Sequence, residues 1–172
     1  MRTQKARFVF LFVLILALVA FPTSVSANQS YVGEALTNKD ADRYYQGDLT
    51  LGNTVTGSLT LGEPVHYWGF GGTAGDTMFV DLVSPQGVET YLKIYVANGS
   101  NWDLIAEQTG CNGRLSSCLE LTLPQTGRYL VGATTYRYVI WGRKTAMNYN
   151  LTVYCTNASG VCGAVAVGEG GF

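Results

Sequence analysis

Apolar and polar residues alternate with a period of two over much of the chain between residues 53 and 155. Within Leu119–Thr135, leucines alternate with polar residues as far as Leu123, a Pro-Gln-Thr-Gly turn follows, and the alternation resumes at Tyr129. This period places one face of a strand on a core and the other in water. Pro and Gly supply the backbone angles of a tight turn. We therefore expect a central hairpin here.

The same alternation marks further strands at regular intervals, separated by short turns. The expected strands outside the hairpin are Asn53–Thr60, Val65–Phe70, Thr77–Ser84, Glu89–Val96, Asp103–Glu107 and Asn148–Tyr154. No segment has the period of an amphipathic helix. About eight antiparallel strands with short turns predict an all-β fold, a β-sandwich of the jelly-roll-like kind.

The N-terminus has the pattern of a targeting segment rather than of the fold. Basic residues precede an apolar run from Phe8 to Phe21, and Val25-Ser26-Ala27 supplies the small residues of a cleavage site. A membrane anchor is the alternative, but the run is shorter than the roughly 20 residues that span a bilayer. We expect a signal peptide at 1–27 and a secreted protein, whether extracellular, on the cell surface or periplasmic, without a membrane span after cleavage.

Composition divides the remaining chain into three parts. Residues 28–49 are polar without a sustained period and predict a lead segment that lies on the domain or is disordered. Residues 50–155 form the sandwich domain. Residues 156–172 are rich in Gly, Ala and Val and predict a flexible tail.

Charge excludes one class of partner. The formal net charge is −1 and 13% of residues are charged, so the whole chain has no field that would steer nucleic acid or anionic lipid.

The four cysteines form two pairs with identical spacing, Cys111 with Cys118 and Cys155 with Cys162. An exported chain meets an oxidising environment, so we expect disulfides. Three connectivities are open, and we favour the two local bridges because each closes a short loop. A four-cysteine zinc site is the alternative, but its knuckles prefer closer spacing.

Candidates for chemistry are few. The single histidine, His66, lies inside a strand pattern, and no GxSxG motif accompanies it. Asp40, Asp42 and Asp48 supply oxygen ligands for calcium but do not match the EF-hand loop. We expect no catalytic residues and no metal or other cofactor, with calcium as the alternative.

One segment, Tyr136–Lys144, interleaves aromatic and basic residues and is expected to be a loop or short strand. Such residues stack on sugar rings or bind extended peptides. The alternative is a loop whose aromatics pack on the sandwich while its cations stay solvated. The candidate ligand-binding residues are Tyr136, Arg137, Tyr138, Trp141 and Arg143, with Trp102 as an exposed aromatic in a separate turn.

Four motifs in order resemble the bacterial pre-peptidase C-terminal domain family. They are His66-Tyr67-Trp68-Gly69-Phe70, Ala74-Gly75-Asp76, Glu89-Thr90-Tyr91-Leu92-Lys93-Ile94-Tyr95 and Leu123-Pro124-Gln125-Thr126-Gly127-Arg128-Tyr129. The resemblance covers about residues 53–155. It implies a compact β-sandwich, usually appended to secreted hydrolases, with some members binding collagen, polysaccharide or calcium. Here Gly110-Cys111-Asn112-Gly113 stands where the family often has an Asp- and Gly-rich loop, which weakens the calcium implication.

These observations favour a secreted, non-catalytic binding module whose partner is an extracellular polymer, either polysaccharide or protein. Two alternatives stay open. Exposed strand edges could lead to self-association as a structural surface protein. The chain could also be an accessory domain or inhibitor of a secreted hydrolase.

Overall fold

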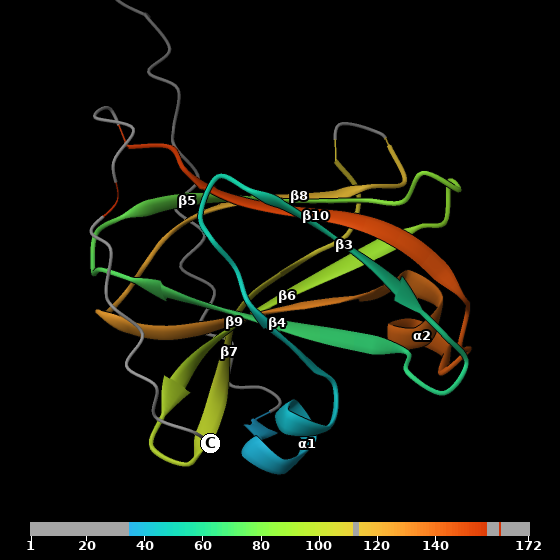
Figure 1. Ribbon diagram of the computed structural model, residues 1–172, viewed down its shortest axis with the longest axis horizontal. Helices are drawn as coiled ribbons and strands as arrows, with labels where there is room; N and C mark the ends of the chain where they lie inside the picture. The colour runs from blue at the N-terminus through green and yellow to red at the C-terminus, as the bar shows by residue number, and fades with distance from the viewer. Residues whose placement is uncertain (1–34, 112–113, 158–161, 163–172) are drawn as a thin grey trace, which may run out of the picture.

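The computed structural model describes residues 35–111, 114–157 and 162, and its strands form two packed sheets (Figure 1). The six-stranded sheet has the order β1 (Leu36–Thr37), β7 (Asn101–Gln108), β6 (Thr90–Asn98), β9 (Gly127–Thr135), β4 (Val65–Gly72), β2 (Tyr45–Asp48). The four-stranded sheet has the order β3 (Thr54–Leu59), β10 (Met147–Cys155), β5 (Thr77–Val83), β8 (Ser117–Thr122). The predicted all-β sandwich is confirmed, with ten strands and one parallel pair, β2 with β4.

The main core lies between the two sheets and is built by the predicted alternation. Met78, Val80 and Leu82 of β5 are fully buried, whereas the residues between them are partly exposed. Leu92 and Ile94 of β6 meet this layer from the other sheet. Burial of this apolar surface is the main stabilising term of the fold.

Two short helices lie outside the sheets, although the sequence predicted none. Helix α1 (Asn38–Arg43) covers part of the outer face of the six-stranded sheet, and α2 (Tyr136–Trp141) lies at one end of the sandwich (Figure 1). Each has only six residues, too few to show a helical period, so its capping residues define it.

The Pro124–Gly127 turn does not close a hairpin, so that prediction is wrong. Strand β8 pairs with β5, whereas β9 pairs with β4 and β6, and the turn therefore crosses between the sheets. Alternation shows which residues face a core, but it does not show which strand lies alongside.

The motifs around this turn meet in space. The Tyr129 hydroxyl donates to the Gln125 carbonyl, an arrangement like the tyrosine corner of other sandwiches. The Leu123 N–H donates to the Asp76 carbonyl at 2.8 Å, and the Gly75 N–H donates to the Leu123 carbonyl at 2.9 Å. The Ala-Gly-Asp and Leu-Pro-x-x-Gly-x-Tyr motifs thus bind each other and shape the fold.

Residues 35–49, expected as a polar lead segment, are part of the six-stranded sheet. They supply both of its edge strands, β1 and β2, and α1 between them. The Arg128 guanidinium holds β2 in place by donating to the Tyr45 hydroxyl at 2.8 Å and to the Asp48 carboxylate at 2.9 Å. Strands of two and four residues are too short to show alternation. The predicted signal peptide lies outside the described residues.

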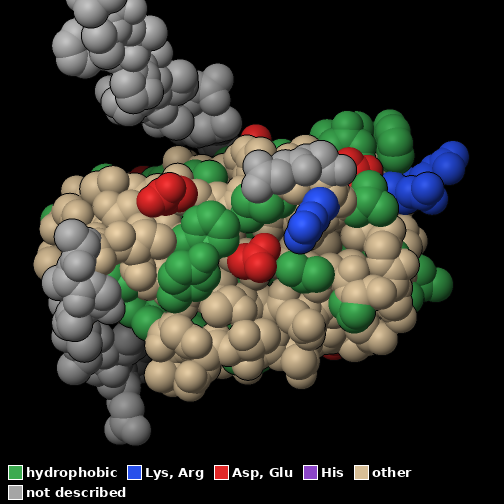
Figure 2. Space-filling view, turned by 90° about the horizontal axis from the view of Figure 1, so that it is seen from above, with side chains coloured by type: hydrophobic (Ala, Val, Ile, Leu, Met, Phe, Trp, Pro, Cys, Tyr) green, Lys and Arg blue, Asp and Glu red, His purple; other side chains and the backbone are tan. Residues whose placement is uncertain are grey.

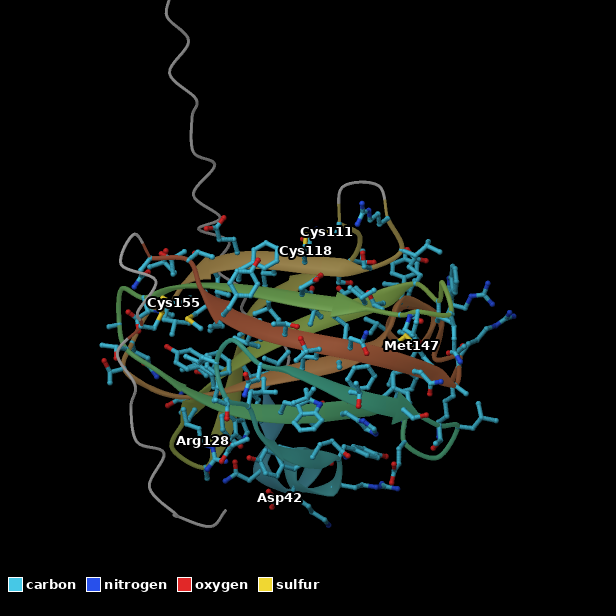
Figure 3. The ribbon with its side chains drawn as sticks, turned by 45° about the horizontal axis from the view of Figure 1, so that its top comes forward. Asp42, Cys111, Cys118, Arg128, Met147 and Cys155 are labelled. Atoms are coloured by element: carbon cyan, nitrogen blue, oxygen red, sulfur yellow. A yellow bond between two sulfur atoms is a disulfide. The ribbon has the colours of Figure 1, made fainter. Side chains whose placement is uncertain are left out.

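Both predicted local disulfides are present (Figure 3). Cys111 bonds to Cys118 and Cys155 bonds to Cys162. Cys162 is buried, and its sulfur lies 3.4 Å from the sulfur of Met78.

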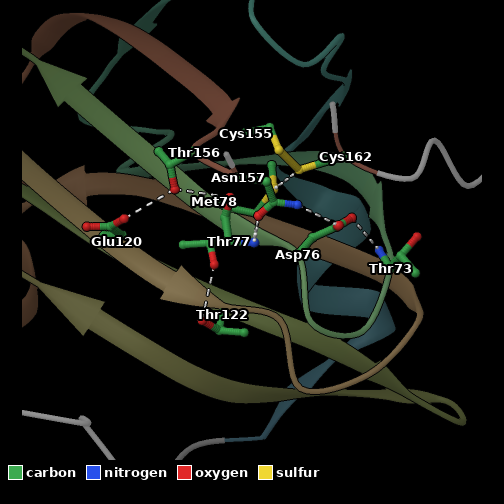
Figure 4. Close-up of a disulfide and its surroundings, with 10 residues drawn as sticks. All are labelled: Thr73, Asp76, Thr77, Met78, Glu120, Thr122, Cys155, Thr156, Asn157 and Cys162. Atoms are coloured by element: carbon green, nitrogen blue, oxygen red, sulfur yellow. Dashed lines mark hydrogen bonds between the residues drawn. A yellow bond between two sulfur atoms is a disulfide. The ribbon is translucent and has the colours of Figure 1, made fainter. Parts of the chain in front are cut away.

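The chain after β10 is anchored beside this second bridge (Figure 4). The Asn157 amide donates to the Asp76 carboxylate at 3.1 Å and accepts from the Thr77 N–H at 2.7 Å. The start of the predicted tail is therefore attached to β5, and residues 163–172 lie outside the described residues.

Candidate functional site

A cleft of about 350 Å³ lies on the outer face of the six-stranded sheet, between α1 and α2. Its floor comes from β4, β6 and β9, and its walls come from the two helices. The lining residues are Ala35, Leu36, Asp40, Arg43, Tyr44, Val65, Tyr67, Lys93, Tyr95, Thr134, Tyr138 and Val139. Four of these are tyrosines and three carry charge.

Helix α1 forms one wall of the cleft, and Thr37 caps its N-terminus. The Thr37 hydroxyl accepts from the Asp40 N–H at 3.2 Å and donates to the Asp40 carboxylate at 2.7 Å. Ala41 is fully buried against the sheet, which turns Arg43 toward the cleft, where its guanidinium lies 5.1 Å from the centre of the Tyr44 ring.

The floor is aromatic, with one cation. Tyr67 of β4 and Tyr95 of β6 meet edge to face, with ring centres 6.0 Å apart. Gly132 lies between their strands, and a Cβ there would be 3.1 Å from the Tyr67 ring, so a larger residue would crowd the ring. Lys93 stands beside Gly132 in the β6–β9 register and is half-buried. Tyr67 and Tyr95 are buried, so the floor is a closed aromatic layer with Lys93 beside it. The partly exposed tyrosines of the lining are Tyr44 and Tyr138.

Helix α2 forms the other wall, and its caps explain why a helix replaces the predicted loop. The Thr135 hydroxyl accepts from the Tyr138 N–H at 3.3 Å at the start. Gly142 ends the helix with a φ of 63°, the left-handed conformation that Gly adopts most easily. Tyr138 and Val139 face the cleft from this helix.

The other candidate ligand-binding residues of the Tyr136–Lys144 segment do not line the cleft. Tyr136 stacks on Tyr91, with ring centres 6.3 Å apart, and Trp141 contacts Tyr136 edge to face at 5.6 Å. Trp141 itself is 60% exposed, and Arg137 and Arg143 are exposed. None of these side chains belongs to the cleft lining that Tyr138 joins.

Trp102 was predicted to be an exposed aromatic, and this is wrong. It is 3% exposed and lies in β7 opposite Leu36 of β1, within the apolar cluster under α1. The reason is that residues before position 50 cover it, and the sequence did not predict that they would.

The buried histidine belongs to a bridge between the sheets. His66 and Trp68 of β4 both bond the hydroxyl of Tyr149 of β10, each at 2.9 Å. Because the Trp68 N–H donates to that oxygen, the phenol proton is available for Nδ1 of a neutral His66. Burial lowers the pKa of His66, opposed by Glu63 at 3.6 Å, and burial raises the pKa of Tyr149 to about 12. These groups connect the two sheets.

The acidic residues that the sequence suggested as calcium ligands contact different parts of the protein. The Asp40 carboxylate accepts from the Thr37 hydroxyl, and Asp48 accepts from Arg128. Among residues 35–111, 114–157 and 162, no group of three or more His, Cys, Asp or Glu side chains is placed to hold a metal ion. The same residues include no helix long and apolar enough to cross a bilayer.

The sequence did not single out most of the cleft. Arg43, Tyr44 and Lys93 lie far apart in the chain, and Tyr67 and Tyr95 occur in ordinary strand patterns. One signal was available, since Tyr67, Lys93 and Tyr95 all belong to the strand positions opposite the main core. Tyr and Lys on the outer face of central strands indicate a covered or functional face.

Comparison with known proteins gave matches among solved structures. No family model matches the chain, and no curated protein does. The pre-peptidase C-terminal domain of a collagenase from Bacillus anthracis is 16% identical, over 63% of this chain and 95% of that chain, with a TM-score of 0.49. The fold resembles that domain. This is the family that the sequence motifs resemble.

Two further solved structures match the chain with the same TM-score. PliG from Aeromonas hydrophila, a periplasmic inhibitor of g-type lysozyme, is 18% identical over 64% of this chain and 96% of that chain, with a TM-score of 0.49. CorA from Methylomicrobium album BG8, a surface-associated copper-binding protein, is 10% identical over 65% of this chain and 98% of that chain, again with a TM-score of 0.49.

Proposed function

We propose that this protein is a secreted, non-catalytic binding module and that the cleft between α1 and α2 binds a polysaccharide chain. The observation that carries the proposal is that the partly exposed rings of Tyr44 and Tyr138 lie on one cleft with Arg43, Lys93 and Asp40. Tyrosine rings stack on the apolar faces of sugar rings, and their hydroxyls bond sugar hydroxyls. The two disulfides support an oxidising compartment.

The cleft suits one or two sugar units of a longer chain. Its volume is at the lower end of the range for small-molecule sites. The charged side chains on the walls and floor would orient a sugar through its hydroxyl or carboxylate groups, with Arg43 acting as a planar donor.

The test is a glycan and matrix-protein array followed by calorimetry on the best ligand. We expect polysaccharide signal from the wild type and at least about tenfold weaker binding after Tyr138→Ala with Lys93→Gln, the loss typical of one well-packed aromatic contact. Tyr154→Ala is the matched control, because this tyrosine is exposed on the outer face of the other sheet. Signal only from matrix proteins, or equal binding by the cleft variant and the control, would refute the proposal.

A further inference from the structure

Three loops and α2 lie together at one end of the sandwich, and we call this region the α2 end: residues 60–64, 84–89, 114–116 and 136–146. Hydrogen bonds connect these loops to one another and to the junction of β9 and α2. The Tyr136 N–H donates to the Glu89 carbonyl at 3.0 Å, and Thr90, next to Glu89, donates to the Leu115 carbonyl at 2.8 Å. The Thr134 hydroxyl donates to the Pro64 carbonyl at 2.7 Å.

Large apolar side chains are exposed at this end. Trp141 is 60% exposed and Ile140 49%, both on α2. Leu61 is 64% exposed and Leu115 52%, each on a separate loop. Among the described residues one other large apolar side chain is exposed, Tyr154 at 38%. Single exposed apolar residues are normal, but four gathered at one end indicate a contact surface.

The formal net charge of −1 gave no reason to expect attraction of the whole chain to anionic lipid, but the charges of the described residues are divided so that one end is cationic. The α2 end carries four cations, Arg114, Arg137, Arg143 and Lys144, against two carboxylates, Glu63 and Glu89. The other described residues carry four cations, Lys39, Arg43, Lys93 and Arg128, against eight carboxylates, at positions 40, 42, 48, 76, 81, 103, 107 and 120. Seen from above, Lys and Arg side chains project from the end where Figure 1 places α2 (Figure 2).

We propose that the α2 end docks the protein on a bilayer surface that carries anionic headgroups. Trp, Ile and Leu would enter the interface between headgroups and acyl chains, where Trp is enriched in membrane proteins. The cations beside them would meet the anionic headgroups, each adding attraction that depends on salt. The proposal is independent of the cleft.

A bilayer fits this surface better than a protein partner does. The exposed apolar side chains come from separate segments of the chain, and only Val139 and Tyr138 of the α2 end share the cleft lining. A protein partner would need a matching pocket for each such anchor. A fluid lipid layer accommodates separate apolar side chains without a preformed pocket for each.

Vesicle binding tests the proposal with an internal reporter. Trp68 is partly buried and Trp102 is buried, so Trp141 is the tryptophan whose emission would change on docking. We expect its emission to shift to shorter wavelength with vesicles of phosphatidylglycerol and phosphatidylcholine in equal parts, and to change little with phosphatidylcholine alone. Added salt should weaken binding to the anionic vesicles.

Substitutions inside and outside the α2 end test which residues contribute to vesicle binding. Leu61→Ser and Ile140→Ser should each lower partition about tenfold, the value of burying one such side chain. Arg143→Gln should lower it about fivefold. Tyr154→Ser and Lys39→Gln, which remove an exposed apolar group and an exposed cation elsewhere, should leave it unchanged.

Three outcomes would overturn the proposal. The first is no binding of the wild type to anionic vesicles at low salt. The second is equal loss in the α2-end variants and the two controls. The third is binding to an acidic polypeptide such as polyglutamate without binding to vesicles, which would assign the surface to a protein partner.

Discussion

At the scale of single residues, His66 shows how a polar side chain is held between the two sheets of this fold. Nδ1 of its ring and the Trp68 indole both bond the Tyr149 hydroxyl across the two sheets. Nδ1 of a neutral ring can accept the Tyr149 proton, whereas a protonated ring can only donate there, so the phenol proton would lose this acceptor. Burial of the ring acts in the same direction by lowering the pKa of His66.

Stability should therefore depend on the titration of His66. The pKa of His66 in the unfolded chain is the ordinary value of 6.5 and the folded value is lower, so the unfolded state takes up its proton first as pH falls. The free energy of unfolding should fall from about pH 6.5 down through the lowered pKa of the folded state. Urea unfolding at a series of pH values measures this.

His66→Gln is the control, because glutamine does not titrate, and its curve should be flatter than that of the wild type. Glu63→Gln should steepen the loss, since Glu63 raises the pKa of His66 against burial. Parallel pH curves for the wild type and His66→Gln would show that the histidine does not titrate with folding.

Gly57 has a role at the same bridge. It lies opposite Tyr149 in the β3–β10 register, and a Cβ there would overlap the Tyr149 ring. We expect Gly57→Ala to lower the free energy of unfolding by about 2 kcal/mol, because the ring must move and its bonds to His66 and Trp68 weaken.

Chemical denaturation compares Gly57→Ala with Gly127→Ala. A Cβ on Gly127 would meet no atom within 4 Å, so that variant should change stability by less than about 0.5 kcal/mol. Similar losses in both variants would mean that general strand effects, and not the Tyr149 ring, decide the cost.

At the scale of elements, the two disulfides form a natural pair for comparison. Each joins cysteines seven residues apart, so loop closure contributes equally, about 2.5 kcal/mol in the chain-entropy model. They differ in packing, because Cys162 is buried against Met78 whereas Cys111 and Cys118 are partly exposed.

Removal of the second bridge should therefore cost more. We expect Cys155→Ala with Cys162→Ala to lower the melting temperature further than Cys111→Ala with Cys118→Ala, because it also releases the segment that Asn157 anchors to Asp76. Calorimetry on the two double variants measures the difference. Equal shifts would show that loop closure alone determines the effect.

At the scale of the whole molecule, the described fold includes residues before position 50, where composition placed the start of the domain. Residues 35–49 contribute β1, α1 and β2, and they cover Tyr67, Tyr95 and Trp102 on the outer face of the six-stranded sheet. We propose that the folding unit begins before Ala35 or at it, and not at Thr50.

Truncation tests this limit. A chain that begins at Thr50 should unfold at lower denaturant concentration than one that begins at Asn28, and its Trp102 emission should shift to longer wavelength because β1 no longer covers that ring. Identical unfolding midpoints would restore the limit at residue 50.

The sequence by itself determined the kind of fold and much of its interior. Alternation with a period of two identified the main strands and the residues of β5 and β6 that face the core, because burial of one sheet face constrains every second residue. The short loop that each local pairing closes favoured the two bridges that the structure contains. These features depend on residues close together in the chain.

The tertiary structure alone decided which strands are neighbours and where a ligand could lie. Pairing of β8 with β5 in the four-stranded sheet, burial of Trp102 under β1 and convergence of Arg43, Lys93 and Tyr138 on one cleft join residues far apart in the chain. Local patterns carry no information on such contacts. They depend on how whole elements pack, because a side chain's exposure is set by what covers it.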